Sequence, residues 1–177
     1  MGNDALTGID FSVAGVVRTE SRAYAVLVDD SSSSYFPIQS GLFQTALIEG
    51  VMSNELDFDV DSYGLYFTLI SMFKAHGIRP TQISFVVKKG GSTSCSLELV
   101  EENELGSKVS RIPILLQDAV VVSSLGTIPI VVYGVAGTEF VFKIDKAIPK
   151  QNIFSAICEE IVKSERMSAI SSGDDNE

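Results

Sequence analysis

Acidic side chains recur at every second position in the stretch N-E-L-D-F-D-V-D, which ends at Asp61. Three of them, Asp57, Asp59 and Asp61, carry the oxygen ligands that divalent cations prefer. The calcium-loop pattern also needs glycine at its sixth position and a bidentate glutamate at its twelfth, and these positions hold Ser62 and Thr68. A period of two is typical of an extended segment. We therefore expect a solvated acidic edge, with a weak Mg²⁺ or Mn²⁺ site as the alternative.

Groups that exchange protons near neutral pH are scarce in this chain. The only histidine, His76, directly precedes Gly77 at the expected end of a helix, where an imidazole interacts favourably with the negative end of the helix dipole. Cys95 and Cys158 lack a C-x-x-C spacing and lie in apolar-patterned segments, so we expect buried free thiols. The sequence contains neither a glycine-rich phosphate loop nor a G-x-S-x-G motif.

One further carboxylate, Asp118, lies at the start of a short apolar helix expected over 117–125. An acidic side chain there can accept hydrogen bonds from unpaired backbone N–H groups and interacts favourably with the positive end of the dipole. The alternative is that Asp118 belongs to a catalytic or ligand site. Both interpretations place it at a helix N-terminus.

The charge balance disfavours nucleic-acid binding as the default function. The chain has 177 residues and a formal charge of −10, whereas nucleic-acid binding draws its affinity largely from Lys and Arg. Removing the three acids of the segment 171–177, which we expect to be a disordered acidic tail, still leaves about −7. Residues 1–170 are expected to form one domain. No apolar run is long enough to cross a membrane, and the N-terminus lacks a signal-peptide pattern, so we expect a cytoplasmic protein.

Periodicity defines the elements that position these residues. Alternating or continuous apolar segments predict strands over 9–18, 23–28, 35–39, 81–89, 93–101, 108–114, 128–133 and 139–144. Helical periodicity predicts four helices over 42–52, 61–76, 117–125 and 149–166. The dipeptide Gly90-Gly91 predicts an antiparallel hairpin between the two strands that flank it.

Local signals predict where these helices begin, end and face the core. Ser40 is the expected N-cap of the first helix, and Gly126 the expected stop of the third. The last helix carries two adjacent apolar stripes, which we expect to pack on the sheet rather than on a partner protein. The stripe expected to face the core on the second helix is Leu65, Leu69, Met72 and Phe73.

Four sequence pieces in this order resemble the bifunctional-nuclease domain family. They are F-P-I-Q-S-G (36–41) leading into the first helix, L-I-S-M-F-K-A-H-G (69–77), Q-D-A-V-V-V-S-S-L-G (117–126) and I-P-I-V-V (128–132). The resemblance implies an α+β domain with a mixed, strongly twisted sheet and about four helices. It also implies a homodimer, in a family to which RNase and DNase activity is assigned.

The departures from the family pattern bear on catalysis. Gln44 stands where the family places an acid, 62–64 where it has Thr-His-Asp, and Asp118 alone remains of an Asp-Ala-x-Pro-Ser-Asp run. Metal-assisted phosphodiester cleavage needs several oxygen ligands around one or two ions. We therefore expect a non-catalytic or weakly active dimeric binding or regulatory module. The alternative is a metal-dependent nuclease acting on RNA or DNA through an acidic site built from Asp57, Asp59, Asp61 and Asp118.

Overall fold

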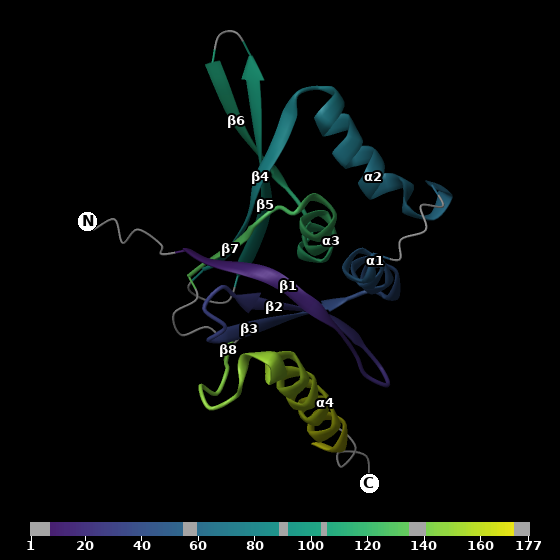
Figure 1. The fold of residues 1–177 in the computed structure, drawn as a ribbon, viewed down its shortest axis with the longest axis vertical. Helices are drawn as coiled ribbons and strands as arrows, with labels where there is room; N and C mark the ends of the chain where they lie inside the picture. Colours follow the sequence, from purple (N-terminus) through teal and green to yellow (C-terminus); the bar gives the residue numbers. More distant parts are fainter. Residues whose placement is uncertain (1–7, 55–59, 89–91, 104–105, 135–140, 172–177) are drawn as a thin grey trace, which may run out of the picture.

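The computed structural model describes residues 8–54, 60–88, 92–103, 106–134 and 141–171. These residues form an eight-stranded sheet with four α-helices, which is an α+β single-domain fold (Figure 1). The strands are β1 (Gly8–Arg18), β2 (Ala23–Asp29), β3 (Ser34–Ser40), β4 (Ile78–Val87), β5 (Thr93–Asn103), β6 (Gly106–Pro113), β7 (Ile130–Tyr133) and β8 (Phe142–Lys143). The helices are α1 (Leu42–Ser53), α2 (Val60–Ala75), α3 (Leu116–Gly126) and α4 (Ile153–Ser171), with a short 3₁₀ turn, η1 (Lys150–Asn152).

The sheet is mixed, as the resemblance implies. Its strand order is β6-β5-β4-β7-β1-β2-β3-β8, and β4 and β7 form its parallel pair. The predicted hairpin between β4 and β5 is confirmed, although Gly90-Gly91 lies outside the described residues, and β1 also pairs antiparallel with β2. The last two strands are not neighbours, because β7 pairs with β1 and β4 while β8 pairs with β3.

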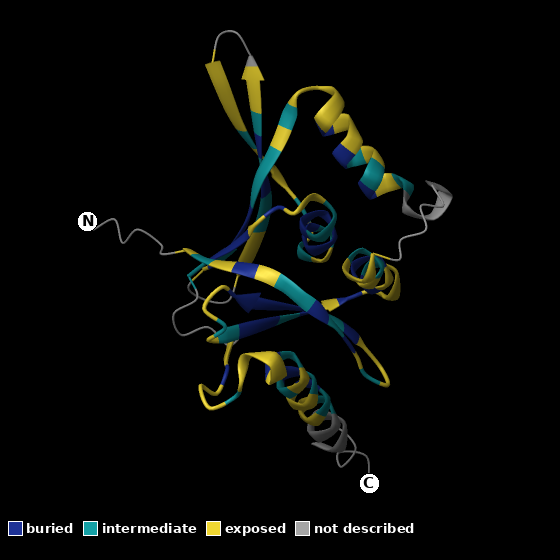
Figure 2. Cartoon of the chain, viewed as in Figure 1, coloured by how far each residue is buried: buried dark blue, intermediate teal, exposed yellow. Residues whose placement is uncertain are grey.

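Helices cover the two faces of the sheet differently. In β2 the side chains alternate, so Ala25 and Leu27 join the core beneath α1, α2 and α3 while Val26 and Val28 join a second core beneath α4. Figure 1 shows α1 and α3 on one side of β1 and β2, and α4 on the other. In Figure 2, α3 is largely buried, because it lies between the sheet and the neighbouring helices.

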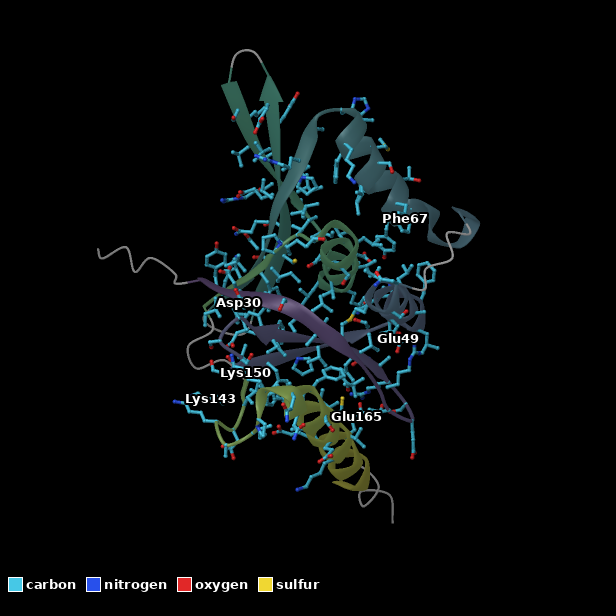
Figure 3. The ribbon with its side chains drawn as sticks, viewed as in Figure 1. Asp30, Glu49, Phe67, Lys143, Lys150 and Glu165 are labelled. Atoms are coloured by element: carbon cyan, nitrogen blue, oxygen red, sulfur yellow. The ribbon has the colours of Figure 1, made fainter. Side chains whose placement is uncertain are left out.

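The last helix packs on its own sheet, as expected from its stripes. Ile153, Ile157 and Ile161 are buried in the second core, and Phe154 packs beside them at the β1 glycine Gly15. The Tyr24 hydroxyl on β2 donates a hydrogen bond to Glu165 of α4. Figure 3 shows Glu165 and Glu49 of α1 on opposite sides of the sheet. The helix extends to Ser171, one residue into the segment expected as a tail.

Two expected helix signals are displaced by one residue. Gly41, not Ser40, is the N-cap of α1, and the Ser40 hydroxyl donates to the Ile38 carbonyl at 3.1 Å instead. At the end of α3 the left-handed residue is Thr127, with φ of 53°, while Gly126 is still helical. Ser40 and Gly126 each lie one residue from the true cap, so they indicated the correct helices but not the residues that cap them.

The core-facing stripe of α2 also differs from the expected one. Phe73 is buried and Leu69 packs against the main core, as expected. Leu65 and Met72, however, are 79% and 53% exposed, and Tyr66 and Ile70 are buried instead. The helix begins at Val60, slightly before the expected start. Because α2 is apolar on nearly all sides, periodicity alone does not distinguish one stripe from the stripe beside it.

Each of the two cysteines packs against a different core. Cys95 packs against the main core, and burial raises the pKa of its thiol to about 11. Burial also raises the pKa of Cys158, which lies on α4 and packs against the second core. Both cysteines are free thiols, but each is half-buried rather than fully buried as expected. Across the described ranges, no helix is both long and apolar enough to cross a membrane.

Candidate functional site

Three helices bring one polar side chain each to a common point. Gln44 lies in the first turn of α1, Tyr66 in the second turn of α2 and Asp118 in the first turn of α3. The Tyr66 hydroxyl donates to Asp118 Oδ1 at 2.5 Å, and the neighbouring Gln44 side chain acts to lower the pKa of Tyr66. We call Gln44, Tyr66 and Asp118 the three-helix site.

The backbone around the site explains why these residues meet. Strand β3 leads through Gly41 into α1, and β6 leads through Leu115 into α3. Buried residues of both helices belong to the main core, so both helices lie on the same face of the sheet. Helix α2 lies over them, with Tyr66 turned towards the core. Figure 3 shows Phe67 of α2 on the same side of the sheet as Glu49 of α1.

The expectation that Asp118 caps α3 is wrong. The N-cap is Leu115, which makes no side-chain cap hydrogen bond, and the carboxylate of Asp118 instead accepts the hydrogen bond of Tyr66. The half-buried carboxylate still lies in the first turn, where the positive end of the helix dipole stabilises a negative charge by about 0.3–1 kcal/mol.

Burial and the neighbouring carboxylate keep the Tyr66 phenol protonated. Burial makes the largest contribution, followed by the hydrogen bond to Asp118 and its charge, and together they raise the pKa of Tyr66 to about 12. The Gln44 side chain acts in the opposite direction, but its effect on the pKa of Tyr66 is smaller. At neutral pH the site therefore holds a neutral phenol and a neutral amide beside Asp118.

Apolar side chains surround these polar groups in the sequence. Phe43 precedes Gln44, Leu65 precedes Tyr66, and Leu115 lies one turn before Asp118. Their exposed fractions are 48%, 79% and 71% respectively. Each helix thus presents a large exposed apolar side chain within one turn of its polar member.

The structure does not describe the acidic side chains of the segment 55–61. Asp57 and Asp59 fall outside the described residues, and Asp61 is in the first turn of α2 with a side chain that is not described. Among the described side chains, no three His, Cys, Asp or Glu groups come together as a metal site. His76 is exposed just beyond the end of α2, near the position expected for it.

The sequence analysis identified Gln44 and Asp118 as positions of interest but not Tyr66. The missed signal is the spacing of Tyr66 with Ile70 and Phe73, which places a hydroxyl on the buried stripe of α2, and a buried hydroxyl needs a partner.

No family model matches the chain, and no curated protein matches it.

Proposed function

We propose that this chain is a dimeric binding or regulatory module, similar in design to the bifunctional-nuclease domains but without phosphodiester-cleaving chemistry. The observation that carries the proposal is the hydrogen bond from Tyr66 to Asp118. It engages the carboxylate that the resemblance retains, and it does so with a phenol whose pKa of about 12 keeps it protonated.

The chemistry of the three-helix site supports binding rather than cleavage. A divalent ion that activates water for attack on a phosphodiester is held by several oxygen ligands, mostly carboxylates. Here Asp118 is accompanied by Tyr66 and by Gln44, which contribute a phenol and an amide. A protonated phenol is a poor general base. Its hydrogen bond to the carboxylate instead holds the two side chains in a fixed geometry.

The exposed apolar side chains around the site support a protein partner, which we propose is a second copy of the chain. Leu65 on α2 and Leu115 before α3 are both more than two-thirds exposed, and burying large apolar side chains of this kind favours association. Sedimentation equilibrium measures this directly: the wild type should be a dimer and Leu65→Glu a monomer. A monomeric wild type at high micromolar concentration would contradict the dimer.

A cleavage assay tests the catalytic half of the proposal. Labelled single-stranded RNA and DNA are incubated with the protein in Mg²⁺ or Mn²⁺, alongside Asp118→Asn and a matched control, Asp30→Asn, at an exposed position on the β2–β3 turn. We expect no cleavage above the buffer blank for any of the three proteins. Metal-dependent cleavage that survives in Asp30→Asn and disappears in Asp118→Asn would show that the chain is a nuclease.

A further inference from the structure

A pocket of about 570 Å³ lies at the end of the α2–α3 pair opposite the three-helix site. Its lining residues come from α2, β4, β5 and the end of α3, and Figure 1 shows α2 running into β4. Tyr66 and Asp118 lie near the starts of these two helices, whereas the pocket uses Lys74 and Leu125 near their ends. The two sites therefore share helices but not residues.

The lining combines apolar walls with charged groups. Apolar side chains come from both helices and from the adjoining strands, with Ile70, Ile78, Pro80, Val100, Leu125 and Ile128 among them. The charged residues are Lys74, Arg79 and Glu102, which leaves one positive charge in excess in a chain whose formal charge is −10.

Both cations are available to a ligand. Lys74 pairs with no carboxylate among the residues that the structure describes. Arg79 pairs with Glu102 at 3.1 Å, but their side chains are 69% and 65% exposed, and such a pair contributes only about 0–1 kcal/mol. A ligand carboxylate can therefore replace Glu102 as the partner of Arg79 at little cost.

Two turns with left-handed backbone, at Gly77 and Thr127, line the pocket. Gly77 follows α2 with φ of 67°, and a Cβ added there would meet nothing within 4 Å. Thr127 follows α3 with φ of 53°, a left-handed conformation that is strained for a β-branched residue. Strain of this kind is found at ligand sites, where the surrounding structure maintains it.

We propose that this pocket binds a small organic carboxylate with an apolar body, its carboxylate at Lys74 and Arg79 and its body against the Ile and Leu side chains. The volume falls in the range of about 300–1,000 Å³ that small-molecule sites occupy, and an apolar wall with a few polar groups is their usual lining. The inference does not depend on the function proposed for the three-helix site.

Octanoate is the probe that tests the pocket, with octan-1-ol as its uncharged analogue. Binding is followed by the NMR shifts of the methyl groups of Ile70, Leu125 and Ile128. We expect octanoate to shift these methyls and octan-1-ol to bind at least about tenfold more weakly, because a charge-assisted hydrogen bond is lost. Lys74→Glu should weaken octanoate to a similar extent.

Two further variants make the test specific. Lys163→Glu makes the same charge change on α4, which covers the other face of the sheet, and should bind octanoate like the wild type. Ile78→Phe reduces the volume of the pocket and should abolish the shifts while the amide spectrum stays folded. If Ile78→Phe does not fold, Lys74→Glu decides the question, since its substitution is at an exposed position.

Any one of four results would overturn the proposal, and the first three concern specificity. They are equal binding of octanoate and octan-1-ol, unchanged binding in Lys74→Glu, and shifts confined to exposed apolar residues such as Leu65 and Met72. The absence of shifts at the pocket methyls with millimolar octanoate would also refute it. None of these results bears on the nuclease assay, so the two proposals fail separately.

Discussion

Replacing Tyr66 by Phe removes the hydroxyl that connects α2 to α3 and leaves the ring in place. The hydrogen bond is 2.5 Å long and ends on a carboxylate, while the Tyr66 side chain is only 8% exposed. A hydrogen bond to a charged group contributes about 1.5–3 kcal/mol. Because Asp118 is only half-buried, water can solvate its freed oxygen, so we expect Tyr66→Phe to lower the free energy of unfolding by about 1–2 kcal/mol at pH 8.

Urea unfolding followed by circular dichroism measures this loss. Tyr133→Phe is the matched control, because the Tyr133 hydroxyl is hydrogen-bonded by the neutral Gln82 amide at 3.0 Å on the other face of the sheet. We expect the control to lose about 1 kcal/mol or less. Equal m-values in all three proteins would confirm that the comparison concerns stability alone.

The pH dependence gives a second, independent measurement. The pKa of Tyr66 rises from 10.0 to about 12 on folding, so its contribution is fully present below pH 10 and is lost as the pH rises through about 12. Tyr66→Phe has no such contribution, and its deficit should shrink by about 1 kcal/mol between pH 9 and 11. A deficit below about 0.5 kcal/mol at pH 8, or one that is constant with pH, would refute the role assigned to this hydrogen bond.

Two further predictions concern stability away from the three-helix site. Thr127→Gly should stabilise the fold by about 0.5–1 kcal/mol because Gly adopts the left-handed conformation without strain, and Thr127→Ala, which keeps the Cβ, should gain less in the same urea titration. Asp29 is buried, which acts to raise its pKa, but hydrogen bonds from Ser34, Ser33 and Ser31 outweigh burial and hold the pKa below its usual value. Asp29→Asn should therefore cost about 1.5–3 kcal/mol at neutral pH. This deficit should disappear as the pH falls through the folded-state pKa of the wild type, and a deficit that persists in acid would contradict the assignment.

The sequence predicted strands and helices well because their patterns are local. In strands such as β2 successive side chains alternate between the two cores. The Gly90-Gly91 hairpin is specified by residues that are neighbours in the chain. Exact caps were less predictable. Ser40 and Gly126 each have the right chemistry for a cap, but packing placed the helix boundary one residue further along, at Gly41 and Thr127.

The site was harder to predict because its contacts are distant in sequence. Tyr66 and Asp118 are 52 residues apart, and no local pattern relates them. The error in α2 had a direct consequence: a stripe through Leu65 and Met72 would turn Tyr66 away from α3, whereas the observed stripe points its hydroxyl at the carboxylate. Choosing between two apolar stripes requires knowing which neighbour each would meet, and a single helix does not contain that information.

The dipoles of α2 and α3 give the two proposed sites opposite requirements. The carboxylate of Asp118 lies at the positive end of α3, where its charge is stabilised. At the other end, the carboxyl termini of both helices disfavour anions, and Lys74 in the last turn of α2 compensates for part of this. An organic carboxylate can bind there only through the cationic side chains, which is why the charge reversal Lys74→Glu is the most sensitive test of the pocket and should leave the three-helix site unaffected.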